Sequence, residues 1–413
     1  MLNKDNVREL AFLTYVDAIE PIEGKDRVEA AVIGGWKTMV KKGAFNPGDI
    51  GIYFEVDSKL PEKPEYEFTA KYHYKIKTQK FKQFYSQGLL MHPNDIGWEV
   101  VNVGGNQCVK DDKGEIHFVD AETRFLTKQL GVTYAVAEDN KRKAKQNPDA
   151  KINAALARHP KIAKKYGKFI KKHKVIRKLF IVFFGKKKDS ETNFPTHFPY
   201  VNKTDQERCE NMKYVLEDKT PFIKTQKCDG SSGTYILERK GKNKFEFYVC
   251  SRNVRQLDEK QQCYYDENFY WQAAKKYNIE EFLKKFLLEN PNISYVCLQG
   301  EICAPKIQGN PHGLSELHFY AFHFTDSEQG RWDIREAKKL WDNNGIESVP
   351  IVDENYILPD DFEAFKLEAD GFYDPSVCEG KKKQEREGFV YYKTTDPNFS
   401  FKNVSRKYLL KHE

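Results

Sequence analysis

A lysine and an acid stand close together in a stretch that has the pattern of a strand and a turn. In the segment KTQKCDGSSGTYIL at 224–237, Lys227 precedes Asp229 by two residues. Residues i and i+2 of an extended chain point to the same side, so we expect both side chains to face one space. The run GSSG at 230–233 is typical of a tight connection to a returning strand. An ion pair on a solvated hairpin would explain this stretch taken alone.

Other charged side chains occur in segments that otherwise have the pattern of buried strands. Glu301 lies in VCLQGEICAP, Lys402 lies in FSFKNVSRKYLLK, and Glu387 directly precedes the strand pattern GFVYY. Arg252 follows a further strand pattern that ends at Cys250. A charge is costly to bury unless it is paired. One such residue usually forms a salt bridge, but several of them together with Lys227 indicate a common polar pocket.

The composition is that of a globular protein. Of 413 residues, 31% are charged and 14% are aromatic, and the formal net charge of +7 favours a polyanionic partner only weakly. The eight cysteines form no C-x-x-C pair, so we expect reduced thiols in a cytoplasmic compartment, without a disulfide framework or a zinc site. The start of the sequence lacks the apolar core of a signal peptide, and LFIVFF at 179–184 is too short to span a bilayer.

The elements that must position these residues fall into three regions. Residues 1–130 show short β patterns, at 30–33, 36–40 and 50–56, with glycine turns between them, which predicts a small β-barrel. Residues 191–413 alternate strand and helix patterns, which predicts a mixed α/β domain. We expect strands there near 222–228, 234–238, 245–251, 295–303, 317–324, 388–393 and 399–404, a helix at 205–216 capped by Thr204 or Asp205, and one or two helices within 264–288.

The region between them, residues 131–190, is strongly basic. Between Lys141 and Lys188 the only acid is Asp149, and apolar residues at 162, 166, 169 and 170 follow helical spacing. We therefore expect a basic helical insertion or linker. A run almost free of acids repels itself unless a polyanion neutralises it, which favours a surface that contacts phosphates. A solvated helical linker is the alternative.

In chain order, the motifs KCDG at 227–230, Arg252, GE at 300–301, YAF at 320–322, EG at 387–388 and Lys402 resemble those of the covalent nucleotidyltransferases. This superfamily includes ATP-dependent DNA ligases, RNA ligases and mRNA capping enzymes. Each motif is weak by itself, and the order over about 180 residues carries the resemblance. The segments AIEPIEGKDRVEAAVIGGW, VKKGAFNPGDIGIYFEVDSKLP and YSQGLLM resemble the N-terminal OB module of one RNA ligase family.

The resemblance implies an α+β fold with an OB-like module at 1–130 and a nucleotidyltransferase domain, built on antiparallel sheets, at 191–413. It implies an ATP-dependent RNA ligase that seals 3′-OH/5′-phosphate breaks in nicked or broken RNA, with duplex RNA and RNA/DNA hybrids as candidate substrates. Apart from the resemblance, we expect a monomer that acts in the cytoplasm, or in a host's cytoplasm if the enzyme is virus-encoded, and no membrane partner. A DNA ligase, a capping-type guanylyltransferase and an inactive nucleic-acid-binding protein are the alternatives. The first two resemble this pattern but carry an OB domain after the last lysine motif, and only 11 residues follow Lys402.

The resemblance also implies a role for each motif residue. Lys227 would attack the α-phosphate of ATP, so its ammonium must first lose a proton, and we expect Mg²⁺ or Lys402 nearby to lower its pKa. Asp229, Glu301 and Glu387 would hold Mg²⁺ or Mn²⁺, although Glu301 could instead bind the ribose.

The remaining motif residues would bind the nucleotide. Lys402 would contact the α-phosphate, Arg252 a phosphate or the ribose, and Phe322 would stack on adenine, although Tyr320 and Phe324 share its expected strand face. Backbone groups near Gln226 would read the adenine edge, Gly230 would lie against the nucleotide, and Ser232 would touch the RNA 3′ end. Many family members carry a second lysine two residues before Lys402, where this chain has Ser400, and whether Lys393 or Lys407 substitutes for it is open.

The OB module would add a surface for RNA. Its basic and aromatic residues would bind a strand through phosphate contacts and stacking. Trp36, Phe84 and Tyr85 could instead fill the small barrel, an alternative favoured for Trp36, so the lysines are the better candidates for RNA contact. The set is Trp36, Lys37, Lys41, Lys42, Lys80, Lys82, Phe84 and Tyr85.

Overall fold

The computed structural model describes residues 1–5, 7–135, 200–201, 205–252, 254–256, 267–379 and 383–412, with single positions at 166, 169, 170, 172, 173, 176, 259 and 265. The predicted basic helical segment at 141–188 lies outside the described residues except for these few positions. Residues Met1–Val132 and His197–Glu413 form one compact unit, and Thr133–Thr196 form another. The first unit holds all the predicted site residues.

Short antiparallel sheets build the N-terminal region, as the glycine-separated strand patterns predict. In β4 alternate residues are buried, beginning with Trp36, so one face of the strand points into the core. Trp36 is 1% exposed and its ring centroid lies 5.7 Å from that of Tyr53. The sheets are β1 (Ala11–Tyr15), β5 (Ile50–Phe54) and β9 (Leu89–Met91); β2 (Ala18–Pro21), β3 (Val28–Ile33) and β4 (Trp36–Lys41); β7 (Gln79–Phe81) and β8 (Phe84–Ser86); and β10 (Glu99–Val103), β11 (Asn106–Lys110) and β12 (Ile116–His117).

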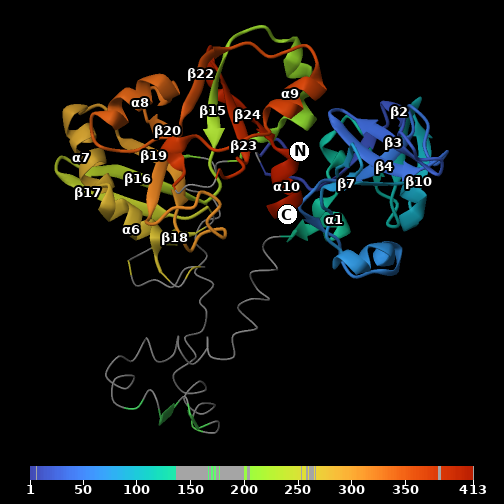
Figure 1. Cartoon of the computed structure of the whole chain (residues 1–413), viewed down its shortest axis with the longest axis horizontal. Coiled ribbons are helices and arrows are strands. Elements are labelled where there is room, and N and C mark those ends of the chain that lie inside the picture. The colour runs from blue at the N-terminus through green and yellow to red at the C-terminus, as the bar shows by residue number, and fades with distance from the viewer. Residues whose placement is uncertain are drawn as a thin grey trace. The chain divides into compact units, whose positions relative to one another are not determined.

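Two further sheets form the C-terminal region (Figure 1). The five-stranded sheet has the order β14 (Glu207–Arg208), β24 (Asp396–Val404), β23 (Gly388–Lys393), β15 (Phe222–Lys227) and β22 (Ile351–Tyr356). The six-stranded sheet has the order β18 (Arg255–Gln256), β17 (Lys244–Cys250), β16 (Ser231–Gly241), β19 (Tyr295–Cys303), β20 (His318–Asp326) and β21 (Gly330–Arg331). Neighbouring strands are antiparallel except β14 and β24. The predicted α+β fold with antiparallel sheets is confirmed.

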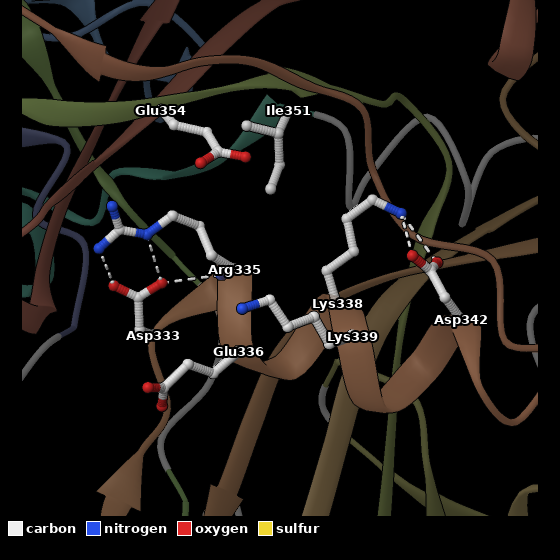
Figure 2. Close-up of a pocket in the computed structure, with 8 residues that line it drawn as sticks. All are labelled: Asp333, Arg335, Glu336, Lys338, Lys339, Asp342, Ile351 and Glu354. Carbon is white, nitrogen blue, oxygen red and sulfur yellow. Dashed lines mark hydrogen bonds and ion pairs between the residues drawn. The ribbon is translucent and has the colours of Figure 1, made fainter.

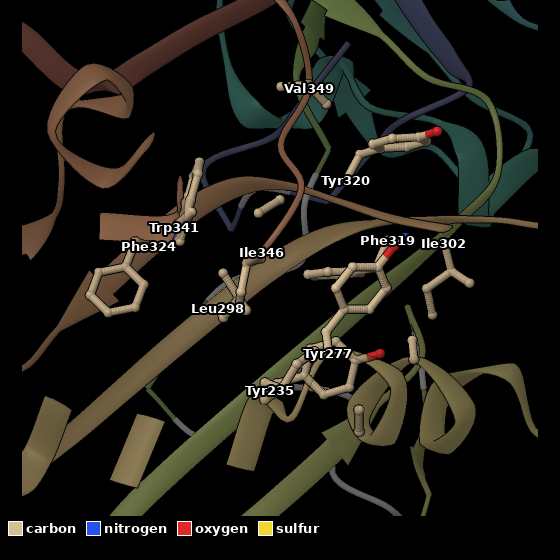
Figure 3. Close-up of a cluster of buried hydrophobic side chains, with 14 of the residues drawn as sticks. Tyr235, Tyr277, Leu298, Ile302, Phe319, Tyr320, Phe324, Trp341, Ile346 and Val349 are labelled. Carbon is tan, nitrogen blue, oxygen red and sulfur yellow. Dashed lines mark hydrogen bonds between the residues drawn. The ribbon is translucent and has the colours of Figure 1, made fainter. Parts of the chain in front are cut away.

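Helices cover the six-stranded sheet through a buried aromatic and aliphatic cluster (Figure 3). In α7 (Ile279–Glu289) the buried residues recur at intervals of three and four, so one apolar stripe packs on the sheet. This cluster includes Phe286 of α7, Phe324 of β20 and Trp341 of α8. The helices of this region are α6 (Phe269–Lys276), α7, α8 (Ile334–Asp342), α9 (Phe362–Glu368) and α10 (Arg406–His412), and the 3₁₀ segments are η4 (Cys209–Glu217) and η5 (Pro375–Val377).

The rest of the N-terminal region consists of short elements. They are β6 (Ser58–Lys59), η1 (Pro64–Tyr72), η2 (Pro93–Ile96), η3 (Glu122–Arg124) and α1 (Thr127–Leu130), and β13 (Thr133–Tyr134) follows at the start of the second unit. Among the helices that the structure describes, none combines the length and apolar character needed to cross a membrane.

Two local predictions were wrong. The helix expected at 205–216 is instead the short strand β14 followed by the 3₁₀ segment η4, and Asp205 does not cap it. The run GSSG at 230–233 is not a separate turn, because β16 begins at Ser231 and pairs with β19 from that residue onward. Backbone pairing with β19 therefore overrides the turn preference of glycine and serine.

A buried ion pair ties α9 to η4. Nζ of Lys366 lies 2.7 Å from Oε1 of Glu210, and their side chains are 2% and 1% exposed. Lys366→Met would leave a buried carboxylate without its cation, so we expect the free energy of unfolding to fall by about 3–5 kcal/mol. Chemical denaturation measures this change. Adding Glu210→Gln should recover part of the loss, and a fall of less than about 1 kcal/mol in Lys366→Met would contradict the expectation.

Candidate active site

Lys227 lies at the end of β15 and faces a cluster of carboxylates. Its backbone pairs with Gly388 at the start of β23, which brings Glu387 beside it. Nζ of Lys227 lies 2.8 Å from the carboxylate of Glu387. Burial alone would lower the pKa of Lys227, but the charges of Glu387, Glu301 and Asp229 outweigh burial and raise it above its ordinary value. The charged side chains at 229, 301 and 387 therefore all act on Lys227.

This direction differs from the sequence-based expectation that surrounding cations lower the pKa of Lys227. Three acids act on the amine, and Lys402, one of the expected cations, has Asp205 as its ion-pair partner. The protein groups by themselves thus keep Lys227 as an ammonium. Deprotonation before attack requires positive charge from a bound partner.

Asp229 is held from two sides by residues that the sequence reasoning did not single out. Its backbone N–H donates to Nε2 of His312 at 3.1 Å, and its carboxylate accepts from the hydroxyl of Tyr408 in α10. The other ring nitrogen of His312 lies 2.8 Å from the carbonyl oxygen of Val377, which can only accept, so the imidazole carries its proton on Nδ1. Burial lowers the pKa of His312 to about 4, so the ring is neutral at neutral pH.

Gly230 allows the chain that follows Lys227 to lie directly against β19. A Cβ atom at this position would be 2.3 Å from the carbonyl oxygen of Ile302 and 3.0 Å from Cγ of Glu301. Only glycine fits this approach. The next residues enter β16, where Ser232 is the register partner of Glu301. The KCDG motif and the GE motif are thereby brought to one place.

The three acids of the cluster repel one another. Burial raises the pKa of Glu301 to about 8. The charge of Lys227 opposes this rise, and the charges of Glu387 and Asp229 add to it. Burial and the charge of Glu387 likewise raise the pKa of Asp229 to about 7. Oxygen ligands crowded in this way are what a hard divalent cation neutralises, so the donor set fits Mg²⁺ or Mn²⁺.

Lys402 and Arg252 meet at a shared carboxylate. Nζ of Lys402 is 2.9 Å from Oδ1 of Asp205, and Nη2 of Arg252 is 2.8 Å from Oδ2 of the same residue. Lys402 lies in β24 opposite Val390, and its charge acts on Lys227 across the strands. Arg252 acts on Glu301. The charges of both predicted phosphate-binding residues therefore act on residues of the cluster. Asp205, which pairs with both of them, was not predicted as a site residue from the sequence.

Phe322 lies in a β-bulge of β20. Gly300 pairs with Ala321 and Gln299 pairs with His323, which leaves Phe322 without a partner of its own. The half-buried ring lines a small cavity together with Ile223 and Tyr392. Tyr320 and Phe324, which were expected to share its strand face, are buried more deeply, at 2% and 0% exposed. Phe322 therefore packs at the edge of the core cluster that contains these two residues and keeps part of its ring exposed.

Gln226 is placed differently from the expectation. Its backbone N–H donates to the carbonyl of Pro350 at 2.9 Å, so this group is not available to an adenine edge. Its side-chain oxygen accepts from the N–H of Asp374 at 2.8 Å. The backbone N–H of Gln226, which was predicted to recognise the adenine edge, is thus hydrogen-bonded to the segment before β22.

The lysines considered as substitutes at Ser400 already have acidic partners. Ser400 lies opposite Tyr392 in the β23–β24 pair. Nζ of Lys393 is 2.6 Å from Asp218, and Nζ of Lys407 is 3.2 Å from Asp370.

The N-terminal surface keeps only part of its predicted set. Trp36 belongs to the core, and its indole N–H donates to Asn211 of η4 at 2.6 Å. Lys37 pairs with Glu20 at 2.7 Å. Lys41, Lys42, Lys80 and Lys82 are exposed, and Phe84 and Tyr85 are half-buried.

A separate surface pocket lies beside α8 (Figure 2). Its lining includes two internal ion pairs, Arg335 with Asp333 at 2.6 Å and Lys338 with Asp342 at 2.8 Å. None of the predicted site residues lines it. The carboxylate cluster around Lys227, rather than this pocket, is the candidate active site.

Comparisons with known proteins agree with this location. A family model described as RNA ligase matches residues 220–409, and one described as an OB-fold domain matches residues 10–93. Among solved structures, the RNA ligase of Naegleria gruberi with PPi is 25% identical, with a TM-score of 0.67, covering 98% of this chain and 99% of that one.

Two variants of the same ligase are similar too. One, with AMP and Mn, is 26% identical with a TM-score of 0.67, covering 98% of this chain and 99% of that one. The other, with ATP and Mn, is 27% identical with a TM-score of 0.66, covering 98% of each chain. No curated protein matches. Residues 220–409 thus form an RNA ligase domain, and an OB-fold domain precedes it at residues 10–93.

Proposed function

We propose that this RNA ligase uses ATP to seal breaks with 3′-OH and 5′-phosphate ends, through AMP bound to Lys227 and then an RNA-adenylate. The observation that carries the proposal is the position of Nζ of Lys227, 2.8 Å from Glu387 and within the electrostatic reach of Glu301 and Asp229. The Naegleria ligase structures with ATP, AMP and Mn support it. We assign the OB-like module to residues 1–130, a basic insertion to 131–190 and the ligase domain to 191–413.

In the first step the neutral amine of Lys227 attacks the α-phosphorus of ATP. The ammonium proton has already passed to solvent. The N–P bond forms as the bond to the pyrophosphate oxygen breaks, and the nitrogen loses a second proton, which leaves with pyrophosphate or to solvent. Lys402 and Arg252 would stabilise the phosphate oxygens as charge moves onto the leaving group, and their electrostatic effects on Lys227 and Glu301 support this role. Phe322 would stack on the adenine.

Asp229, Glu301 and Glu387 are the residues that would hold a divalent cation. When bound, Mg²⁺ or Mn²⁺ supplies positive charge that offsets the phosphate charge and favours the neutral amine. His312 and Tyr408 keep Asp229 in place through its N–H and its carboxylate. Glu387 orients Nζ of Lys227 through their hydrogen bond.

The later steps transfer and release AMP. An oxygen of the RNA 5′-phosphate attacks the AMP phosphorus, and the N–P bond to Lys227 breaks. The 3′-OH then attacks the 5′-phosphorus of the RNA-adenylate, a phosphodiester forms, and AMP leaves. The exposed lysines at 41, 42, 80 and 82 are the OB-module groups we assign to the RNA backbone.

Phe322→Ala should weaken ATP binding without abolishing the reaction. Stacking of a base on an aromatic ring contributes about 1–3 kcal/mol, so we expect the KM for ATP in self-adenylation to rise about 5- to 150-fold. Phe322→Tyr keeps the ring and should stay close to the wild type. Initial rates of protein labelling over a range of ATP concentrations measure this, and an unchanged KM in Phe322→Ala would remove the residue from the base site.

Labelling with α-labelled ATP and Mg²⁺ or Mn²⁺, followed by a denaturing gel, tests the proposed function. We expect label on the protein, its transfer to 5′-phosphorylated RNA, and sealing of nicked RNA in a panel of RNA, DNA and hybrid duplexes. Label from GTP alone would indicate capping-type chemistry. Sealing of DNA alone would indicate a DNA ligase, and no label from any nucleotide would indicate a binding protein. A chelator should prevent labelling.

A further inference from the structure

Asp205 stands between the two cations that the proposed mechanism assigns to phosphates. One of its oxygens lies 2.9 Å from Nζ of Lys402 and the other lies 2.8 Å from Nη2 of Arg252. The side chains of Asp205 and Lys402 are 10% and 9% exposed, whereas that of Arg252 is 47% exposed. A single carboxylate therefore joins a buried ammonium to a guanidinium that reaches solvent.

After burial and Asp205, the largest effects on the pKa of Lys402 come from positive groups. They are Arg8 of the N-terminal segment, Arg208 of β14 and Lys227 of β15. Arg8 and Arg208 are themselves paired with acids, Glu55 and Asp57. Burial and these cations lower the pKa of Lys402 to about 8, although Asp205 acts to raise it. Asp205 is thus the acid that keeps this lysine protonated near neutral pH.

We propose that Asp205 is a positioning residue for phosphate binding, which keeps Lys402 charged and holds it beside Arg252. The inference rests on the proposed function, since it concerns the cations that would bind ATP. The carboxylate stays ionised itself, because Lys402, Arg252 and Arg8 outweigh its burial and lower its pKa below the ordinary range. A phosphate entering the site meets two cations that are already gathered and charged.

Asp205→Asn tests the inference through a pH profile. An opposite charge favours the charged form of a lysine, so removing the carboxylate lowers the pKa of Lys402. In the free enzyme the alkaline limb of kcat/KM for ATP in self-adenylation should then move to lower pH by about 1–3 pH units. Asp205→Glu should return the alkaline limb to its wild-type position.

Lys402→Arg provides the matched background. A guanidinium does not lose its proton in this pH range, so the alkaline limb that Lys402 causes should disappear in Lys402→Arg. Adding Asp205→Asn to it should leave the shape of the profile unchanged. A merely structural role for Asp205 would instead lower the rates to a similar extent at every pH in both backgrounds.

The outcomes separate this inference from the proposed function. Failure of the wild type to become labelled would overturn the proposed function. If the wild type becomes labelled but the alkaline limb keeps its position in Asp205→Asn, whether or not that variant binds ATP more tightly, only the role proposed for Asp205 is overturned. If Asp205→Asn does not fold, the pH profile of Lys402→Arg decides. An alkaline limb that persists in Lys402→Arg cannot arise from deprotonation of Lys402, and this result also overturns the inference.

Discussion

Lys227→Ala should abolish formation of the protein–AMP adduct under all conditions of pH, metal and ATP concentration. The variant lacks the only atom that we assign to the N–P bond, so no residual labelling through this route is expected. Lys227→Arg should be equally inactive, because a guanidinium keeps its proton and cannot attack. Denaturing gels after incubation with α-labelled ATP measure the adduct directly.

The later chemistry provides a control for this variant. Lys227→Ala should still seal RNA that already carries a 5′-adenylate, since the last step needs no adduct on the protein. Lys219→Ala removes an exposed lysine, which is paired with Asp360 at 2.7 Å, and should label like the wild type. Labelled adduct on Lys227→Ala would place the nucleophile elsewhere and undo the assignment of the site.

The sequence was most informative where charge interrupts an apolar strand. Glu301 lies in a strand that is mostly buried, and Lys402 lies in the buried half of β24. The cost of an unpaired buried charge predicted a shared polar pocket for them. The structure gathers Glu301 with Lys227, Asp229 and Glu387, and places Lys402 within their electrostatic reach. The strands that carry them were also predicted closely, because their β-branched and aromatic runs are long and are bounded by turn residues.

The partners of these residues could not be predicted in the same way. Asp205, His312 and Tyr408 lie in a loop, a turn and a short helix, where no periodic pattern fixes the direction of a side chain. Tyr408 reaches Asp229 from 179 residues away, and Asp205 reaches Lys402 from 197 residues away. Such contacts depend on how the sheets pack. The sequence contains no local signal for them.

The bulge at Phe322 shows a second limit. Strict alternation would give Phe322 the same face and burial as Tyr320 and Phe324. One extra residue in β20 shifts the register against β19, and Phe322 stays half-buried at the edge of the cluster that encloses the other two. Side-chain period alone cannot reveal a bulge, because the hydrophobic pattern on either side of it remains continuous.

Glu387→Ala should reduce the rate of self-adenylation by about 100-fold or more. The change removes a ligand that we assign to the divalent cation, and a loss of about 3 kcal/mol of transition-state stabilisation corresponds to a factor of this size. It also removes the hydrogen-bond partner that orients Nζ of Lys227 at 2.8 Å. Single-turnover labelling at saturating ATP measures the rate, and Asp360→Ala, which removes an exposed carboxylate paired with a lysine, serves as the matched control.

Glu387→Gln distinguishes the two roles of the carboxylate. An amide can still hydrogen-bond to Lys227, but it is a poor ligand for Mg²⁺ compared with a carboxylate. If the main role is metal binding, the variant should be nearly as slow as Glu387→Ala, and raising the Mn²⁺ concentration should recover part of the rate. If Glu387 served only to pair with Lys227, its neutralisation would ease deprotonation of the amine, and labelling would be as fast as in the wild type or faster. A fast Glu387→Gln variant would therefore exclude Glu387 from the metal site and leave Asp229 and Glu301 as its ligands.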